Sequence, residues 1–376
     1  MIKSYNVRLS SEPSLSFMAT KAANSMDIDI EKKLTHELSV QADVETHFNV
    51  GLIVGNSGSG KTTLAHQILG IDCFDDQIDN EKPIIDQFPS QMSYEDRASI
   101  LNSIGLSQVV CWIRPVKTLS NGQKFRALAA LKIAKAGDEV IAIDEWTSVV
   151  DRTVAKVMSY ALAKSARRFD KKFVLVSCHS DVIEWLAPDW IIDCNKQSYE
   201  DRRSLQQERK ELLQFEIRPV SSKTWRYFSR YHYLSQNFPG GTTYSFGLFH
   251  ESEQIGFICY ANYVAGQFEK FHFNRAVIHP DYVGLGLSRH LINSTAEYMV
   301  NKYNVQVYGK FSSFPVFKML SRDRRWVMNG TGLMTNEKTG FKGKNRIKEK
   351  QLTKASRNRV RWYSFKYIPV KNGTNE

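Results

Sequence analysis

The chain has 376 residues, a hydrophobic share of 42% and a net charge of +12, which leaves room for about two domains of ordinary size. It has no run of about 18 apolar residues, so we expect no membrane partner or membrane-spanning segment. The N-terminus lacks the apolar core of a signal peptide. Five scattered cysteines, none in a C-x-x-C pair, predict reduced thiols and exclude a disulfide framework. These features predict a cytoplasmic protein.

The positive charge belongs to the second half of the chain. Residues 1–200 hold 22 Lys and Arg against 26 Asp and Glu, whereas residues 201–376 hold 29 against 13. The stretch 322–361 alone has 13 basic and 3 acidic residues, interleaved with Trp326 and Phe341 and followed directly by Trp362. Cations among aromatic rings suit nucleic acid, so we expect DNA or RNA to bind the C-terminal half. The alternative is a solvated basic surface without a dedicated partner.

The first half alternates short apolar runs with helical patterns. The apolar runs are "VGLIV" (50–54), "EVIAIDE" (139–145) and "KKFVLVSCHS" (171–180). Strands that alternate with helices predict an α/β domain with a largely parallel sheet, over residues 1–200. The polar stretch 195–212 is interpreted as a linker or a solvated helix.

The segment after the first of these strands has the composition of a phosphate-binding loop. "GNSGSGKT" matches G-x-x-x-x-G-K-[ST] between a predicted strand and a predicted helix, as the motif requires. Its glycines let backbone N–H groups face phosphate oxygens, while Lys61 reaches the β- and γ-phosphates and Thr62 binds Mg²⁺. The predicted ATP site consists of Gly55, Asn56, Ser57, Gly58, Ser59, Gly60, Lys61, Thr62 and Thr63.

An acidic pair ends the predicted strand at 139–145. After a phosphate-binding loop, Asp144 is expected to hold the metal and Glu145 to polarise the attacking water. Three further motifs accompany the pair: "LSNGQ" at 119–123, "SVVD" at 148–151, and His179 behind the next strand. As a set, over about residues 45–195, they resemble the ATP-binding-cassette (ABC) ATPases.

This resemblance implies the rest of the metal and γ-phosphate site. Gln87 in "IIDQFP" matches the glutamine of the family's Q-loop. It would hold Mg²⁺ together with Thr62 and Asp144. His179 would be the switch histidine.

The resemblance also implies that two copies assemble around ATP. Ser120 and Gly122 of one copy would close over the γ-phosphate that Lys61 holds in another, giving an ATP-dependent homodimer. Asn121 departs from the glycine usual in the family's motif. A simple helix cap by Ser120 is the alternative role for this turn.

The second half has a different pattern, which predicts a mixed α+β domain over 215–370. We expect strands at 215–220, 242–264 (two, around a turn at 250–253), 267–280, 305–311 and 361–370, a helix over "SSKTWRYFSRYHYL" (221–234), and a short helix at "FPVFKML" (314–320).

Within this half, "HPDYVGLGLSRHLI" (279–292) contains a second glycine-spaced turn before a helix. Consecutive N–H groups at a helix N-terminus suit a pyrophosphate. The segment resembles the R/Q-x-x-G-x-G/A loop of the GNAT acyltransferases, with Asp281 in place of the usual Gln or Arg. The resemblance implies that acetyl-CoA, or a related acyl-CoA, is bound by Val283, Gly284, Leu285, Gly286, Leu287 and Ser288. An ordinary tight strand-to-helix turn is the alternative.

For acyl transfer itself, Glu269 on the strand before this loop is the expected base. His272 and Tyr308 are weaker candidates. The tyrosine that often serves as general acid in the family would fall near 317–320, where the chain has Phe317. The aromatic segment 225–235 loosely resembles the Mom-type DNA-modification branch of the GNAT fold.

These expectations combine into an ATPase coupled to a GNAT-like acyltransferase that modifies a base amine of nucleic acid. Two alternatives stay open. One is a nucleic-acid-binding ABC ATPase whose second domain is catalytically silent. The other is an N-acetyltransferase for proteins or small molecules that is regulated by ATP.

Overall fold

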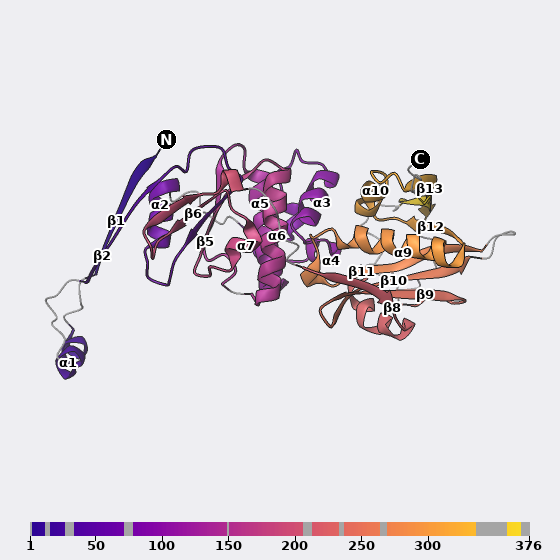
Figure 1. The fold of residues 1–376 in the computed structure, drawn as a ribbon, viewed down its shortest axis with the longest axis horizontal. Helices are drawn as coiled ribbons and strands as arrows, with labels where there is room; N and C mark the ends of the chain where they lie inside the picture. The colour runs from indigo at the N-terminus through magenta and orange to yellow at the C-terminus, as the bar shows by residue number, and fades with distance from the viewer. Residues whose placement is uncertain are drawn as a thin grey trace, which may run out of the picture. The chain divides into compact units, whose positions relative to one another are not determined.

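The computed structural model describes residues 2–11, 16–26, 34–70, 78–148, 150–205, 213–232, 237–263, 269–335 and 359–369. The chain divides into two compact units, Met1–Leu212 and Leu213–Glu376. The first is a parallel α/β unit and the second a mixed α+β unit, so the predicted fold class is confirmed (Figure 1). Among the described residues, no helix is both long and apolar enough to span a bilayer.

Unit 1 is built on a five-stranded sheet of order β4-β5-β3-β6-β7, in which the edge strand β7 is antiparallel to its neighbour and the other pairs are parallel. A separate antiparallel hairpin, β1–β2, precedes it. The strands are β1 Lys3–Ser11, β2 Leu34–Ala42, β3 Val50–Val54, β4 Val140–Ile143, β5 Lys172–Ser177, β6 Trp190–Asp193 and β7 Ser198–Asp201. The helices are α1 Phe17–Ser25, α2 Lys61–Leu69, α3 Tyr94–Ser103, α4 Val109–Trp112, α5 Asn121–Lys135, α6 Arg152–Arg168 and α7 Val182–Leu186.

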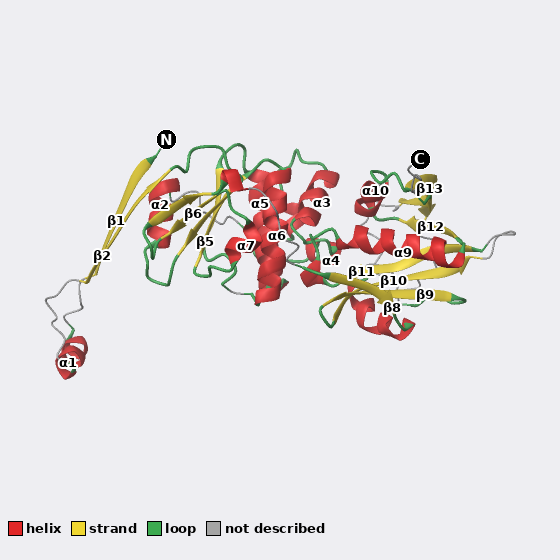
Figure 2. Cartoon of the chain, in the orientation of Figure 1, coloured by secondary structure: helices red, strands yellow, loops and turns green. Residues whose placement is uncertain are grey.

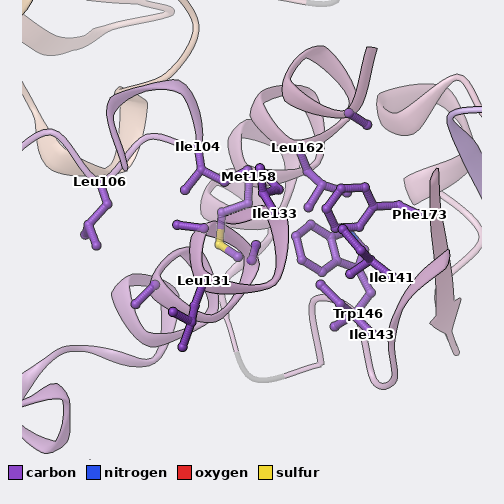
Figure 3. Close-up of a cluster of buried hydrophobic side chains, with 14 of the residues drawn as sticks. Ile104, Leu106, Leu131, Ile133, Ile141, Ile143, Trp146, Met158, Leu162 and Phe173 are labelled. Atoms are coloured by element: carbon purple, nitrogen blue, oxygen red, sulfur yellow. The ribbon is translucent and has the colours of Figure 1, made fainter. Parts of the chain in front are cut away.

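The central strands are continuous apolar runs because the sheet is covered on both faces. Successive side chains of a strand point to opposite faces. Accordingly, Leu52 of β3 packs in the cluster with α3, α5 and α6, whereas Ile53 packs in the cluster with α2 and the β1–β2 hairpin. Figure 3 shows part of the first cluster, in which Trp146 and Phe173 lie beside Leu162 of α6. Both faces therefore support the end of β3, where the phosphate-binding loop begins.

Unit 2 is a seven-stranded sheet of order β13-β14-β12-β11-β10-β9-β8. Strands β11 and β12 pair in parallel, and helix α9 connects them across the sheet, as Figure 2 shows. The strands are β8 Phe215–Pro219, β9 Thr243–His250, β10 Glu253–Tyr263, β11 Lys270–Ile278, β12 Gln306–Phe311, β13 Trp326–Thr335 and β14 Arg359–Tyr367; the helices are α8 Trp225–Phe228, α9 Leu287–Tyr303 and α10 Phe314–Leu320.

Two expected elements differ in the structure. The segment 221–234 is not one helix, since α8 is a single turn between the 3₁₀ turns Ser222–Thr224 and Ser229–Tyr231. Its inward aromatics recur every third residue, as Trp225, Phe228 and Tyr231, and pack together in one cluster. That spacing matches the 3₁₀ period. Within 195–212, residues 198–201 form the edge strand β7, and 206–212 lie outside the described residues.

A buried carboxylate joins α9 to the turn before β13. Asp323, only 5% exposed, accepts hydrogen bonds from Arg325 Nε (2.9 Å), Asn293 Nδ2 (2.8 Å) and Arg289 Nε (3.2 Å). Asn293 Oδ1 in turn accepts from Trp326 Nε1 at 2.8 Å. These bonds, those from Arg325 above all, hold the pKa of the Asp323 carboxyl well below its usual range.

We expect Asp323→Asn to lower the stability of unit 2 by about 3 kcal/mol at pH 7, because two arginines lose a buried counterion. The depressed folded-state pKa means that this contribution is present above the unfolded pKa of about 4 and is lost as the pH falls below it. The difference from wild type should therefore shrink toward pH 3. Hydrogen exchange of α9 amides measures it, with Glu269→Gln as an exposed-carboxylate control. An Asn variant as stable as wild type at pH 7 would contradict this assignment.

Candidate functional site

The phosphate-binding loop lies where β3 ends and α2 begins. Gly58 (φ 80°) and Gly60 (φ 84°) have left-handed backbone conformations, which non-glycine residues adopt at a cost. Gly60 is the N-cap of α2 and provides no side chain to cap it, so the first N–H groups of the helix keep room for an anion. The loop is also braced from the next strand, since Asn195 Oδ1 accepts from Asn56 N at 3.1 Å.

The structure brings two of the three predicted metal ligands together. Thr62 Oγ1 donates to Asp144 Oδ2 at 2.8 Å, although 82 positions separate the two residues. Lys61 Nζ donates to Asn56 O at 2.6 Å, which places the ammonium across the loop. Ser59 Oγ is buried without a hydrogen-bond partner among the described residues. Glycine-rich backbone is thus surrounded by the unpaired Ser59 hydroxyl, the Lys61 ammonium and the Thr62–Asp144 pair. This arrangement fits a nucleoside triphosphate with bound Mg²⁺.

The residues after β4 are held in a strained turn. Glu145 (φ 50°) and Thr147 (φ 72°) are both left-handed non-glycine residues, a conformation that costs of order 1–3 kcal/mol each and clusters at functional sites. Ser148 N donates to Glu145 O at 3.0 Å, which closes the turn. The Glu145 side chain is exposed and Asp144 is half-buried, so the two carboxylates have the separate environments expected for a water-activating group and a metal ligand.

His179 is tied to this turn through the end of β5. Ser177 Oγ donates to Trp146 O at 3.1 Å and accepts from His179 N at 3.1 Å. Trp146 N also donates to Val176 O at 2.8 Å. The half-buried His179 follows β5, and Asp144 and Glu145 directly follow β4, the strand that pairs with β5.

Gln87 is engaged elsewhere in this structure. Its Oε1 accepts from Asp79 N at 2.8 Å, and its Nε2 donates to Asp79 O at 2.8 Å and Lys82 O at 3.1 Å. The side chain thus closes the loop that precedes it. To serve as the predicted Mg²⁺ ligand, Gln87 would have to exchange its bond from Asp79 N for the metal.

The turn formed by "LSNGQ" (119–123) caps a helix. Ser120 Oγ accepts from Gln123 N, and the Gln123 side chain accepts from Ser120 N, which together form a capping box at the start of α5. Gly122 is buried, and a Cβ there would lie 3.1 Å from Val154 Cγ1 of α6. The helix-cap role of Ser120 is therefore present, and the turn's predicted role in another copy stays a prediction. In "SVVD", residue 149 lies outside the described residues and Asp151 caps α6.

The second glycine-spaced turn also has the geometry of an anion site. Gly284 (φ 104°) and Gly286 (φ 88°) are left-handed, and Gly286 is the N-cap of the 17-residue helix α9 without a side-chain cap. Gly286 and Ser288 are exposed, Val283 and Leu285 are half-buried, and Leu287 is buried and anchors the helix. An exposed helix N-terminus with free N–H groups fits a pyrophosphate.

The strand that leads to this turn is bulged. The β10–β11 register shifts between Phe257 and Cys259, so that two residues of β11 oppose one of β10. Arg275 lies in this bulge with φ 52°. The parallel pairing of β11 with β12 ends at Phe273 and Gly309, and β12 continues against β14 alone. Beyond Phe273, β11 is therefore not paired with β12. Its backbone groups there can contact an acyl-CoA that extends from the turn.

The expected base lies at the opposite end of β11 from the glycine turn. Glu269 is exposed and immediately precedes the strand, whereas the turn follows it. Nine intervening residues at about 3.3 Å each put roughly 30 Å between Glu269 and the turn, so Glu269 cannot contact a pyrophosphate there, and its role as base at the thioester end of an acyl-CoA stays a prediction. Phe317, at the position expected for the family's tyrosine, lies in α10 and stacks on Tyr363 with ring centroids 4.2 Å apart.

A group of three polar side chains beside the turn was not predicted. Tyr231 Oη lies 3.2 Å from His279 Nε2, and His279 Nδ1 lies 3.6 Å from the Asp281 carboxylate. Burial raises the pKa of Tyr231. The spacing His-x-Asp at the end of a strand was a possible signal, but the tyrosine comes from 48 positions upstream.

No protein-family model and no curated protein matches the chain. Among solved structures it is similar to an ATP-binding cassette of an ABC transporter in its ADP conformation (13% identity, 52% of this chain and 90% of that one, TM-score 0.34). It is similar to part of an ABC transporter complex from Clostridium perfringens (16% identity, 45% of this chain and 83% of that one, TM-score 0.36). It is also similar to the ribosomal-protein-S5-alanine acetyltransferase from Vibrio fischeri (15% identity, 42% of this chain and 95% of that one, TM-score 0.29). Similarities at these scores do not support a function. The functions proposed below are supported by the geometry of the two sites.

Proposed function

We propose that the chain is an ABC-type ATPase coupled to a GNAT-like acyltransferase whose acceptor is a base amine of nucleic acid. The observation that carries the ATPase half is the bond between Thr62 and Asp144 beside Lys61. The acyltransferase half is supported by the left-handed glycines at the exposed start of α9, directly after a bulged strand.

In this proposal the first loop holds ATP with Mg²⁺. Backbone N–H groups of 55–63 and Lys61 bind the phosphates, and Thr62 and Asp144 hold the metal, which would neutralise phosphate charge when bound. Glu145, exposed beside Asp144, orients and polarises the attacking water. Ser120 and Gly122 of a second copy would complete the site, which makes ATP the link between two chains.

In the second site, backbone N–H groups of 283–288 bind the pyrophosphate of an acyl-CoA. The donor's thioester supplies the activated acyl group. The bulge at Arg275 leaves strand backbone unpaired to orient the thioester carbonyl. An amine of the acceptor attacks the carbonyl carbon, its proton leaves to a base, and CoA leaves as the thiol.

One observation favours a second candidate function. Asp281 puts a carboxylate within the segment that would meet the pyrophosphate, and Phe317 stands where the tyrosine that often serves as general acid was expected. Both features suit a nucleic-acid-binding ATPase whose second unit binds without transferring an acyl group.

Mass spectrometry of nucleosides separates the two. Purified protein with ATP, acetyl-CoA and a mixed-sequence oligonucleotide is expected to yield an acylated base that is absent when acetyl-CoA is omitted. DNA and RNA oligonucleotides of one sequence are assayed in parallel. Retention of oligonucleotide without any acylated nucleoside, by wild type and with either nucleic acid, would favour the silent second unit.

A further inference from the structure

Four adjacent strands of unit 2 form an exclusively basic part of the sheet. Strands β11, β12, β14 and β13 contain six Lys and Arg residues and no Asp or Glu. The six are Lys270, Arg275, Lys310, Arg359, Arg361 and Lys366. A polyanion complements this excess of positive charge in the strands, of which Lys310 and Lys366 share one face.

The strand register places a mixed row of side chains on one face. His272 pairs with Tyr308, Tyr308 with Lys366, and Lys366 with Val327, so the four lie side by side across four strands. Alternation along each strand puts Lys310 and Trp362 on the same face. We call these six residues the sheet platform. Val327 is 48% exposed and Lys310 is exposed, while Tyr308, Trp362 and Lys366 are half-buried.

The opposite face of the same strands is closed. Phe311 stacks on Phe365 with centroids 6.0 Å apart, and Phe317 of α10 lies 6.1 Å from Phe365. Phe273 and Trp326 join them edge to face at 5.8 Å. Aromatic residues on that face therefore serve as core, whereas those of the platform reach solvent.

Two of the three rings of the platform, Trp362 and Tyr308, have a lysine beside them. Lys310 Nζ lies 4.5 Å from the Trp362 ring centroid, and Lys366 Nζ lies 5.9 Å from the Tyr308 centroid. His272 stacks on Tyr308 at 5.5 Å and 19°. Burial, and next the charge of Lys310, lowers the pKa of His272, which keeps this ring neutral and suited to stacking. A lysine is flexible enough to leave its ring for a phosphate while a base takes the ring.

The indole of Trp362 lies flat against β13. A Cβ on Gly332 would come within 2.8 Å of Trp362 Nε1, and one on Gly330 within 3.6 Å of the ring. Glycine at both positions leaves room for the ring on the strand backbone. One ring face is thus seated on the strand backbone, and Lys310 Nζ lies over the ring.

From these contacts we infer that the sheet platform binds single-stranded nucleic acid, with bases on Tyr308 and Trp362 and phosphates on Lys310 and Lys366. The inference rests on the proposed nucleic-acid acceptor and assigns it a surface. Stacked rings beside cations bind unpaired bases of any sequence, whereas bases inside a duplex have no exposed ring face to offer.

The test is fluorescence anisotropy of the full chain with a labelled 20-nucleotide mixed-sequence DNA, as single strand and as duplex, without ATP or acetyl-CoA. Trp362→Leu is expected to weaken single-strand binding by about 5- to 150-fold and to leave duplex binding unchanged. Gly332→Ala, which keeps the tryptophan but displaces the indole, is expected to weaken it in the same direction. An RNA strand of the same sequence distinguishes the two nucleic acids.

The charges are tested separately. Lys310→Gln with Lys366→Gln should reduce the slope of log affinity against log salt by about 0.7 for each phosphate that the protein no longer neutralises. Lys302→Gln is the matched control, because Lys302 Nζ also lies over a tyrosine, 5.0 Å from the Tyr298 centroid, but on α9.

Unchanged single-strand affinity in both Trp362→Leu and Gly332→Ala, or an equal loss of duplex binding, would overturn the platform. This result is independent of acyl transfer. If the platform variants lose single-strand binding but wild type yields no acylated nucleoside, only the proposed chemistry is refuted. If wild type yields an acylated nucleoside but the platform variants bind single strands like wild type, only the platform is refuted.

Discussion

Glu145→Gln is expected to reduce ATP turnover by about 100-fold or more while ATP stays bound, and to convert the chain into an ATP-dependent dimer. The substitution removes the carboxylate that polarises water but keeps the Thr62–Asp144 pair and Lys61, which hold the metal and phosphates. If ATP joins two copies, blocked hydrolysis leaves them joined. Gel filtration with and without ATP, alongside a phosphate-release assay, measures both effects.

Lys61→Ala is the matched control for this experiment. It removes the cation that lies across the loop, so hydrolysis should also fall, but ATP should be bound weakly and no dimer should form. The double variant should behave like Lys61→Ala. A Glu145→Gln protein that elutes as a monomer at every ATP concentration would refute the ATP-linked dimer, and normal turnover in either single variant would refute the ATP site.

Gly286→Asp is expected to weaken acetyl-CoA binding by about 100-fold or more. Gly286 is the exposed, left-handed N-cap of α9. A carboxylate there would face the pyrophosphate and would compete with it for the backbone N–H groups at the start of the helix. Like charges in such proximity cost several kcal/mol, and tenfold in affinity corresponds to about 1.4 kcal/mol. Calorimetric titration of acetyl-CoA and free CoA measures the loss, and ATPase activity should be retained.

Gly241→Asp separates this effect from backbone strain and added charge. Gly241 is also left-handed (φ 83°), and a Cβ there meets no atom within 4 Å. We expect this variant to bind acetyl-CoA like wild type. Wild-type protein that binds neither CoA species at millimolar concentration would show that the second turn is not a coenzyme A site.

The local parts of both loops could be predicted from the sequence alone. A phosphate-binding loop depends on glycines that adopt left-handed conformations and on a helix that begins directly after them, and both properties belong to adjacent residues. Gly58, Gly60, Gly284 and Gly286 all have positive φ. The acidic pair after β4 was predictable for a different reason, because carboxyl ends of parallel strands in one sheet share an edge.

Roles that depend on more distant residues were less predictable. Gln87 carries the expected residue type, but its amide is bound to backbone of 79–83. Glu269 immediately precedes β11, and only the path of a bound acyl donor along that strand would decide whether its carboxylate reaches the acceptor amine. The helix over 221–234 failed because packing on β10 and β11 favoured a spacing of three residues over the helical period.

The amino-acid sequence by itself determined the two glycine-spaced turns, the acidic pair and the excess of basic residues in the second half, since each is a property of neighbouring residues or of composition. Only the tertiary structure decided which aromatic rings became core and which formed a surface. Tyr308, Val327 and Lys366 meet through β-strand register between segments far apart in the chain. A shift of one residue in that register would turn each side chain to the opposite face, and no local pattern specifies it.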